Sequence, residues 1–256
     1  MLSKNQKKLI VSMAQKKQRD THGLFLAEGP KIVNELLEAG FSPQLLAATS
    51  DWEAPAHLKH EVVLLSPAEL AAASLLKTPQ QVLALFRQPI YTLNNGAIKD
   101  GLTLVLDGVQ DPGNLGTIIR VADWFGIKTI VCSHDTADVF NPKVVQATMG
   151  ALARVQLFYT DLNSFLPACK KDHHLPVYGA FLEGDSIYNS SLKTPALLVM
   201  GNEGQGIRPA TARHLTQRLT IPSFPPESSG PESLNVGVAT AIICAEFRRQ
   251  QGVQLS

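Results

Sequence analysis

The chain has 256 residues, enough for one large or two smaller domains, and can bury a substantial core. Hydrophobic residues make up 45% and charged residues 18%, which excludes disordered, collagen-like and disulfide-scaffold proteins. The formal net charge of +1 gives by itself no reason to expect a nucleic-acid partner. Its three cysteines lack metal-ligand spacing, so we expect a reduced compartment and no metal site.

No segment is typical of export or of membrane insertion. The apolar stretch at residues 9–14 is too short for the core of a signal peptide, and it is followed by the charged residues Lys16 and Lys17. The longest uncharged apolar run, residues 233–245, is too short to span a bilayer. The sequence therefore predicts a soluble, cytoplasmic protein that does not associate with a membrane.

Charge is concentrated at the N-terminus. Residues 1–22 hold six basic side chains and one acidic side chain, a net charge of +5, so the remaining residues must carry a net charge of −4. Such a segment is either the solvated face of a basic helix or a surface that contacts phosphates, and the sequence alone leaves both interpretations open.

Short apolar runs alternate with helical patterns in the next part of the chain. We expect strands at 24–27, 45–49, 62–65 and 82–86 and helices at 31–39 and 67–75, which form a small α/β unit. Residues 88–101 carry turn-forming Pro, Asn and Gly without apolar periodicity, so they read as a linker. We place the domain boundary near residue 98, which gives domains 1–98 and 99–256.

The second half has six candidate strands, several of them continuous apolar runs, at 102–107, 129–133, 155–160, 176–181, 196–200 and 218–222. Strands of this kind, separated by helical segments, predict a mostly parallel sheet that is covered on both faces. Ligands bind at the carboxyl ends of such strands. Three loops are therefore of interest, namely those after residues 107, 200 and 222.

The first loop leads into a helix that we expect to begin near Leu115 and Gly116. Gly113 and Gly116 allow a close backbone approach to a partner, and the exposed N–H groups at a helix start favour an anion. The helix has two charges, Arg120 and Asp123. Taken alone, an ordinary i,i+3 ion pair between them is the preferred interpretation.

The other two loops carry polar groups beside strand ends. The second, 201–206, has three glycines and is typical of a tight turn, but a plain turn does not explain the carboxylate of Glu203. The third leads into an apolar helix that is buried or packed against another subunit, with Ser233 expected near its N-cap. Asn235 needs a polar partner there, and capping is the structural alternative to a functional role.

Together these loops resemble the motifs of the SpoU, or TrmH, family of RNA ribose 2′-O-methyltransferases in the SPOUT superfamily. The first loop matches N-x-G-x-x-x-R from Asn114 to Arg120, the second matches G-N-E-G-x-G at 201–206, and the third matches I-P followed by S-L-N-V at 233–236. Three short motifs in this order, each at the end of a predicted strand, are not expected by chance. Residues 25–29, 78–80, 141–143 and 147–151 also resemble segments of the family.

There are two departures from the family pattern. Gln146 stands where members often have a basic residue, and the stretch between residues 222 and 233 is longer than usual. The first concerns a contact with RNA, and the second concerns the rim of the cofactor pocket.

The resemblance implies a C-terminal SPOUT-type parallel sheet with a deep trefoil knot that binds S-adenosylmethionine, preceded by a small ribosomal-protein-like α/β substrate-binding domain. General topology rules alone would predict an unknotted sheet, because true knots are rare. The resemblance also implies an RNA substrate and a homodimer whose active sites lie at the subunit interface. By the same resemblance, the cofactor would be held by Gly201, Asn202, Gly204, Ile221 and Leu234. The reacting groups would be surrounded by Asn114, Arg120, Glu203, Ser233 and Asn235.

Other functions stay open at this point. Within the family, ribosomal RNA is the preferred substrate because of the extra N-terminal domain, with transfer RNA as the alternative. Outside it, the strand, glycine-rich loop and helix at 102–122 also fit a dinucleotide-binding oxidoreductase, although no G-x-G-x-x-G is present. A catalytically silent RNA-binding protein is the third alternative, which the joint presence of all the motif residues disfavours.

Overall fold

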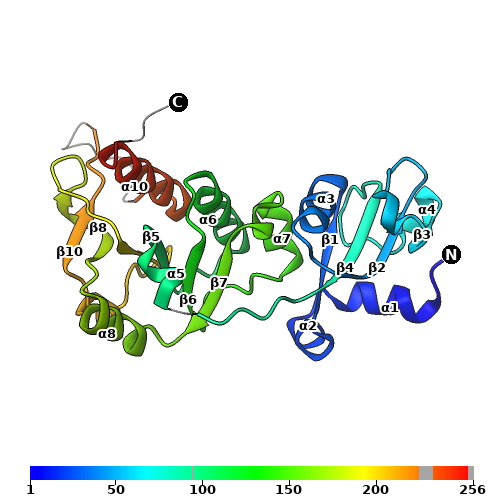
Figure 1. The fold of residues 1–256 in the computed structure, drawn as a ribbon, viewed down its shortest axis with the longest axis horizontal. Helices are drawn as coiled ribbons and strands as arrows, with labels where there is room; N and C mark the ends of the chain where they lie inside the picture. Colours follow the sequence, from blue (N-terminus) through cyan, green and yellow to red (C-terminus); the bar gives the residue numbers. More distant parts are fainter. Residues whose placement is uncertain (94, 225–232, 253–256) are drawn as a thin grey trace. The chain divides into compact units, whose positions relative to one another are not determined.

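The structure is a computed structural model that describes residues 1–93, 95–224 and 233–252. The chain forms two compact units, the first from Met1–Ile90 with Asp138–Arg154 and the second from Tyr91–Ala137 with Val155–Ser256. No helix within the described ranges is long and apolar enough to cross a membrane. Each unit is built around its own β-sheet (Figure 1).

The first unit contains a four-stranded mixed sheet in the order β1-β4-β2-β3. Its strands are β1 (Leu24–Glu28), β2 (Pro43–Ala48), β3 (Val62–Leu64) and β4 (Val82–Arg87). Strand β4 pairs antiparallel with both β1 and β2, and β2 pairs parallel with β3. The helices beside the sheet are α3 (Pro30–Glu38), η1 (Ala56–Leu58) and α4 (Pro67–Ala71). All the predicted elements of this unit are present, although α4 ends earlier than expected.

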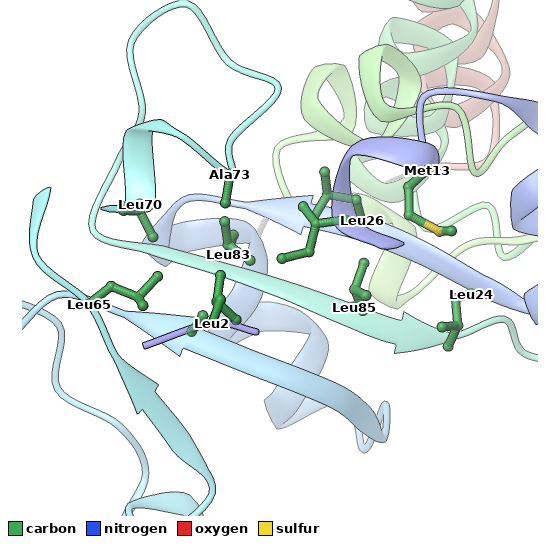
Figure 2. Packing of buried hydrophobic residues seen from close by; sticks show 11 residues of the cluster. Leu2, Met13, Leu24, Leu26, Leu65, Leu70, Ala73, Leu83 and Leu85 are labelled. Atoms are coloured by element: carbon green, nitrogen blue, oxygen red, sulfur yellow. The ribbon is translucent and has the colours of Figure 1, made fainter. Parts of the chain in front are cut away.

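The basic N-terminal segment folds as two helices, α1 (Lys4–Ser12) and α2 (Lys16–His22), not as one. Its apolar side chains belong to the core, because Leu2, Ile10 and Met13 are buried against β1 and β4. Figure 2 shows Leu2 and Met13 among the leucines of these two strands. The segment is therefore part of the fold of the first unit, and only its lysine-bearing face is available to a partner.

Arg19, one of the six basic residues of this segment, is buried and has a structural role. Its side chain is only 2% exposed, and it donates from Nε (3.1 Å) and Nη2 (2.6 Å) to Asp138 Oδ2. Nη1 donates to the backbone carbonyl of Met13 at 2.6 Å. A guanidinium held in this way is not free to contact a phosphate, so the structural interpretation applies to Arg19.

The insertion Asp138–Arg154 of the first unit carries α7 (Pro142–Thr148) and η2 (Ala151–Ala153). The ring of Phe140 lies 4.9 Å from that of Phe25 on β1, and Arg154 forms an ion pair with Glu35 on α3. Gln146, which departs from the family pattern, lies on α7 and is partly buried. The segment between two of the sequence motifs is therefore held by side-chain contacts within the first unit.

The second unit contains a six-stranded, fully parallel sheet in the order β10-β8-β9-β5-β6-β7. The strands are β5 (Leu102–Asp107), β6 (Thr129–Ser133), β7 (Gln156–Thr160), β8 (Val177–Ser186), β9 (Ala196–Gly201) and β10 (Gln217–Thr220). Strands β5 and β9 are buried along their whole length, as continuous apolar runs predict. The parallel α/β sheet expected from the sequence is confirmed, whereas the trefoil knot stays a prediction.

Helices cover both faces of this sheet. Helices α5 (Asn95–Lys99), α8 (Leu162–His173) and α9 (Pro209–Ala212) lie on the face that carries Val105 and Val199. Helices α6 (Pro112–Trp124) and α10 (Val236–Gln250) pack side by side (Figure 1). Phe247 of α10 contacts the ring of Tyr178, a residue that alternates with Val177 of the first face. The α6–α10 pair therefore covers the opposite face.

The predicted linker at 88–101 is partly wrong, because it contains α5. Ile98 of this helix is 3% exposed and packs in the core beside Leu166 and Val199. A helix of 5 residues gives almost no periodic signal in a sequence rich in turn formers. The burial of Ile98 anchors this helix in the core of the second unit.

Candidate active site at the carboxyl ends of the parallel strands

The three motif loops of the second unit meet through a chain of side-chain hydrogen bonds. Asn235 donates from Nδ2 to Asn114 Oδ1 at 2.8 Å, and Asn114 donates from Nδ2 to Glu203 Oε1 at 2.9 Å. These residues are 121 and 89 positions apart in the chain. Three of the five predicted catalytic residues are therefore in direct contact, one from each loop.

The start of α6 differs from the sequence expectation. The helix begins at Pro112 instead of Leu115, because Asp111 is its N-cap and accepts a hydrogen bond at 2.8 Å from the backbone N–H of Asn114. An aspartate followed by proline is a typical N-cap and first helical residue, and this signal could have been read from the sequence. The cap places Asn114 in the first turn, facing Glu203.

Asn235 is the N-cap of α10, the capping role that the sequence left open for this residue, and Ser233 lies near the N-cap as expected. Asn235 Oδ1 accepts from the backbone N–H groups of Gly237 (2.9 Å) and Val238 (3.3 Å). The amide nitrogen of the same side chain remains available for Asn114. Capping therefore does not exclude a functional role, since one amide caps the helix and also donates to Asn114. Ser233 is exposed two residues before the cap.

Arg120 lies on α6, two turns after the cap, and its side chain is exposed. No hydrogen bond or ion pair joins it to any of the residues that the structure describes, so the i,i+3 pair with Asp123 is not formed. An exposed guanidinium that has no such partner among the described residues is available for an anionic ligand.

Gly201 ends β9 where the following turn folds back over it. Asn202 and Gly206 exchange two backbone hydrogen bonds of 3.0 and 2.9 Å across the turn. A Cβ on Gly201 would lie 2.2 Å from the carbonyl carbon of Gly206, so only glycine fits this position. Asn202 Oδ1 accepts from the backbone N–H groups of Gly204 and Gln205 at 2.9 and 3.0 Å, which fixes the turn that presents Glu203.

The two predicted apolar cofactor residues lie at the ends of neighbouring elements. Ile221 directly follows β10 and is partly exposed, and Leu234 precedes the cap of α10 with 48% of its surface exposed. Partly exposed aliphatic side chains at strand ends can cover an apolar ligand. Most of the longer stretch between residues 222 and 233, namely residues 225–232, lies outside the described part of the chain.

An ionic cluster that sequence reasoning missed lies beside these loops. Asp107, at the end of β5, is fully buried and accepts from the backbone N–H (2.9 Å) and Nε (2.7 Å) of Arg208. Arg208 also donates to both carboxylate oxygens of Asp135, at 3.2 and 3.3 Å. A hydrogen bond from Ser133, with a further contribution from Arg208, lowers the pKa of Asp135. The only signal in the sequence is a charged residue at the end of an apolar strand.

A small polar pocket is open above this cluster. The pocket is lined by residues at the ends of β5 and β9 and in the loop after β6. Asn202 closes one side by donating from Nδ2 to the carbonyl oxygen of Gly108 at 2.8 Å. The lining residues are Asp107, Gly108, Gln110, Asp135, Asn202, Gln205 and Arg208.

We expect Arg208→Met to lower the free energy of unfolding by about 3 kcal/mol, because it leaves the carboxylate of Asp107 buried without its ion partner. Urea denaturation followed by circular dichroism measures this loss. Asp107→Asn in the same background should recover part of it, since the two residues act as one unit. Equal stability of Arg208→Met and the unaltered protein would contradict this role.

The sequence pattern of the SpoU rRNA Methylase family matches residues 101–245, which include all three loops. The MRM3-like substrate binding domain matches residues 4–84, in the first unit. The fold and the joined loops thus define the second unit as a SpoU-type methyltransferase domain.

Named relatives and solved structures agree with this class. The 23S rRNA (guanosine(2553)-2′-O)-methyltransferase RlmP of Bacillus subtilis is 31% identical over 96% of this chain and 97% of its own length. The 23S rRNA (guanosine-2′-O-)-methyltransferase RlmB of Haemophilus influenzae is 37% identical, but the match covers 59% of this chain and 60% of that protein.

Among solved structures, a protein of Porphyromonas gingivalis described as a TrmH-family RNA methyltransferase has a TM-score of 0.86 and 44% identity, with 98% of this chain and 99% of that chain covered. The S-adenosylmethionine-bound rRNA methyltransferase of Sinorhizobium meliloti has a TM-score of 0.83 and 27% identity, with 100% and 97% covered. The chain belongs to the SpoU, or TrmH, family of RNA methyltransferases.

Proposed function

We propose that this chain transfers the methyl group of S-adenosylmethionine to a ribose 2′-hydroxyl of ribosomal RNA. The observation that carries the proposal is the hydrogen-bonded chain Asn235–Asn114–Glu203, which joins three family motifs at the carboxyl ends of parallel strands. The relatives with this sequence pattern are named as 2′-O-methyltransferases of 23S rRNA. The chain is accordingly an enzyme that depends on S-adenosylmethionine.

The residues around the second and third loops fit the cofactor. The tight turn that begins at the buried Gly201 leaves Asn202 partly exposed and Gly204 exposed, and polar groups of such a turn can bind the polar parts of a nucleoside. Ile221 and Leu234 offer aliphatic surface for its base. When bound, S-adenosylmethionine supplies an activated methyl group on a positively charged sulfur.

The protein must then position the hydroxyl, help it to lose its proton and exclude water. We assign two roles to Arg120. It binds the phosphate of the target nucleotide, and it stabilises the negative charge that develops on the 2′-oxygen. A guanidinium stays protonated in proteins, so it acts by stabilising charge and not as a base, and the substrate phosphate can relay the proton. Asn114 and Asn235 orient the reacting groups, Glu203 fixes Asn114, and exposed Ser233 borders the site.

The test of this function is a methyl-transfer assay with tritiated S-adenosylmethionine on ribosomal RNA from cells that lack the protein. We expect one 2′-O-methyl site to be restored, and mapping that site names the nucleotide. Transfer of label to tRNA alone would favour the alternative substrate, and absence of transfer to any RNA would favour a silent RNA-binding protein. Calorimetric binding of NADH instead of S-adenosylmethionine would support the oxidoreductase.

We propose that the first part of the chain, residues 1–98, selects the RNA, and that its exposed N-terminal lysines contact phosphates. Replacement of Lys4, Lys8 and Lys17 by glutamine should make the plot of log binding constant against log salt concentration shallower by about 2. Deletion of residues 1–22 is a poorer test because it removes buried core residues. An unchanged slope in filter-binding assays at two salt concentrations would refute the contact.

We propose that the active form is a homodimer in which the exposed face of α6 and α10 contacts a second copy. Trp124 is 84% exposed and Val238 48% exposed on these two helices. Trp124 lies four residues after Arg120, so both project from one face of α6 and the site would adjoin the interface. Trp124→Glu should weaken dimerisation at least 30-fold in sedimentation equilibrium. Tyr188→Glu, at another exposed aromatic residue of this unit, is the control.

Action of this enzyme in the cytoplasm stays a prediction.

A further inference from the structure

Gly237 is the second residue of α10, and it is buried where this helix packs beside α6. We propose that Gly237 and Thr117 of α6 form a positioning contact for the methyl transfer, because the absence of a side chain at position 237 lets the two helices approach until Asn235 reaches Asn114. Thr117 stands at an open position of the first motif, and Gly237 directly follows the third. This role rests on the proposed function, in which the two asparagines orient the reacting groups.

A side chain at position 237 would collide with α6. A Cβ there would lie 2.9 Å from Cγ2 and 3.3 Å from Cβ of Thr117, whereas carbon atoms in contact are normally about 3.5–4.0 Å apart. Rotation about χ1 of Thr117 can move Cγ2, but the position of Cβ is fixed by the backbone of α6. Gly237 lies within a helix and has no positive φ, so the backbone itself would accept alanine. Glycine is needed here for the close approach of the helices and not for a turn.

The same crowding would act on the cap of α10. The Cβ at position 237 would lie 3.2 Å from Asn235 Oδ1, the oxygen that accepts a hydrogen bond from the backbone N–H of Gly237 at 2.9 Å. The nitrogen of this amide, Nδ2, donates to Asn114 Oδ1 at 2.8 Å. Because both atoms belong to one planar amide group, a displacement of Oδ1 also moves Nδ2. A methyl group at position 237 would therefore disturb the cap and the hydrogen bond to Asn114 together.

Thr117 lies between two residues that we assign to the reaction. Asn114 precedes it by three positions and Arg120 follows it by three, so Thr117 is a neighbour of both on the surface of α6. Asn114 also donates to Glu203, the last residue of the hydrogen-bonded chain that starts at α10. A shift of α6 away from α10 at Thr117 would therefore move Asn114 and Arg120 together, away from the groups that α10 holds.

Gly237→Ala should lower the single-turnover rate of ribosomal RNA methylation about 10- to 100-fold, because the reacting groups lose their alignment. The Kd of S-adenosylmethionine, measured by isothermal titration, should change by no more than about 3-fold, because the contact lies between two helices and not on the cofactor residues. Alanine is the better helix former, which offsets part of the strain, so thermal unfolding followed by circular dichroism should be nearly unchanged. A general loss of structure would instead lower rate, affinity and stability together.

Thr117→Ser is the compensating variant, because it removes Cγ2 and keeps the hydroxyl group. Alone it should lower the rate by about 3-fold, since the contact between the helices loosens. Combined with Gly237→Ala it should return the rate to within about 3-fold of the unaltered enzyme, because the new methyl group occupies the space of the lost one. Thr160→Ser removes the same methyl group from the edge strand β7, so it is the matched control and should not restore the rate of Gly237→Ala.

The side-chain amide signals of Asn114 and Asn235 in ¹⁵N–¹H spectra report their hydrogen bond without RNA. We expect both signals to shift in Gly237→Ala and to return in the double variant. Unshifted signals, a full rate in Gly237→Ala, a loss that Thr117→Ser does not relieve, or an equal loss of cofactor affinity would each overturn the proposal. Failure of the proposed function is distinguishable, because the unaltered protein would then not methylate RNA, whereas the amide signals would still decide whether the contact positions the two asparagines.

Discussion

Arg120→Ala should lower the rate of methyl transfer by at least 10²- to 10³-fold and leave the affinity for S-adenosylmethionine nearly unchanged. Arg120 is exposed on α6, and its removal breaks no hydrogen bond or ion pair with any described residue. Alanine is also a better helix former than arginine at such a position. The loss would therefore fall on the substrate phosphate and on the 2′-oxygen, where charge develops in the transition state.

Single-turnover methylation of ribosomal RNA measures the rate, and isothermal titration measures cofactor affinity. Arg213→Ala is the matched control, because Arg213 is an exposed arginine beside α9 in the same unit. We expect this control to keep full activity. A fully active Arg120→Ala enzyme would refute the assignment, and an equal loss in the control would trace the effect to general electrostatic attraction of RNA.

Gly201→Ala should abolish cofactor binding and methyl transfer together. The added Cβ would lie 2.2 Å from the carbonyl carbon of Gly206 and 2.3 Å from the backbone nitrogen of Ile207. Both are backbone atoms, so no side-chain rotation relieves the clash and the turn after β9 must open. Opening breaks the hydrogen bonds between Asn202 and Gly206 and displaces Glu203 from Asn114.

Gly204→Ala is the control for this effect, because it adds the same methyl group to the same turn. Its Cβ would meet only Asn202 Oδ1 at 3.7 Å, an ordinary contact distance. Calorimetric titration with S-adenosylmethionine should show at least a 100-fold loss of affinity for Gly201→Ala and a much smaller change for Gly204→Ala. Similar losses in both variants would mean that the backbone of residue 204, and not the shape of the turn, limits cofactor binding.

Much of the second unit could be predicted from sequence because its strands are long apolar runs. Strands β5 and β9 were expected at nearly their observed bounds, since burial on both faces demands apolar residues at every position. Short elements were less predictable. Helix α5 has few residues and is anchored by the buried Ile98, and the starts of α6 and α10 depend on which polar side chain caps each helix.

The net charge of +1 is uninformative as a sum, whereas the positions of the basic residues in the structure are informative. Of the basic residues in segment 1–22, Arg19 is buried in an ion pair with Asp138, while Lys4, Lys8 and Lys17 are exposed. Sequence counts all of them alike, because formal charge carries no information on burial. Only the fold separates a structural guanidinium from ammonium groups that can reach a phosphate.

The sequence by itself determined the α/β class, the parallel sheet and the three motif loops, because strand burial and backbone turns leave local patterns in residue type. The tertiary structure alone decided that Asn235, Asn114 and Glu203 form one hydrogen-bonded chain and that Asp107, Arg208 and Asp135 form a cluster beside it. These contacts join residues that are 73 to 121 positions apart. Contacts of that range depend on how the strands are ordered in the sheet, and no local pattern records that order.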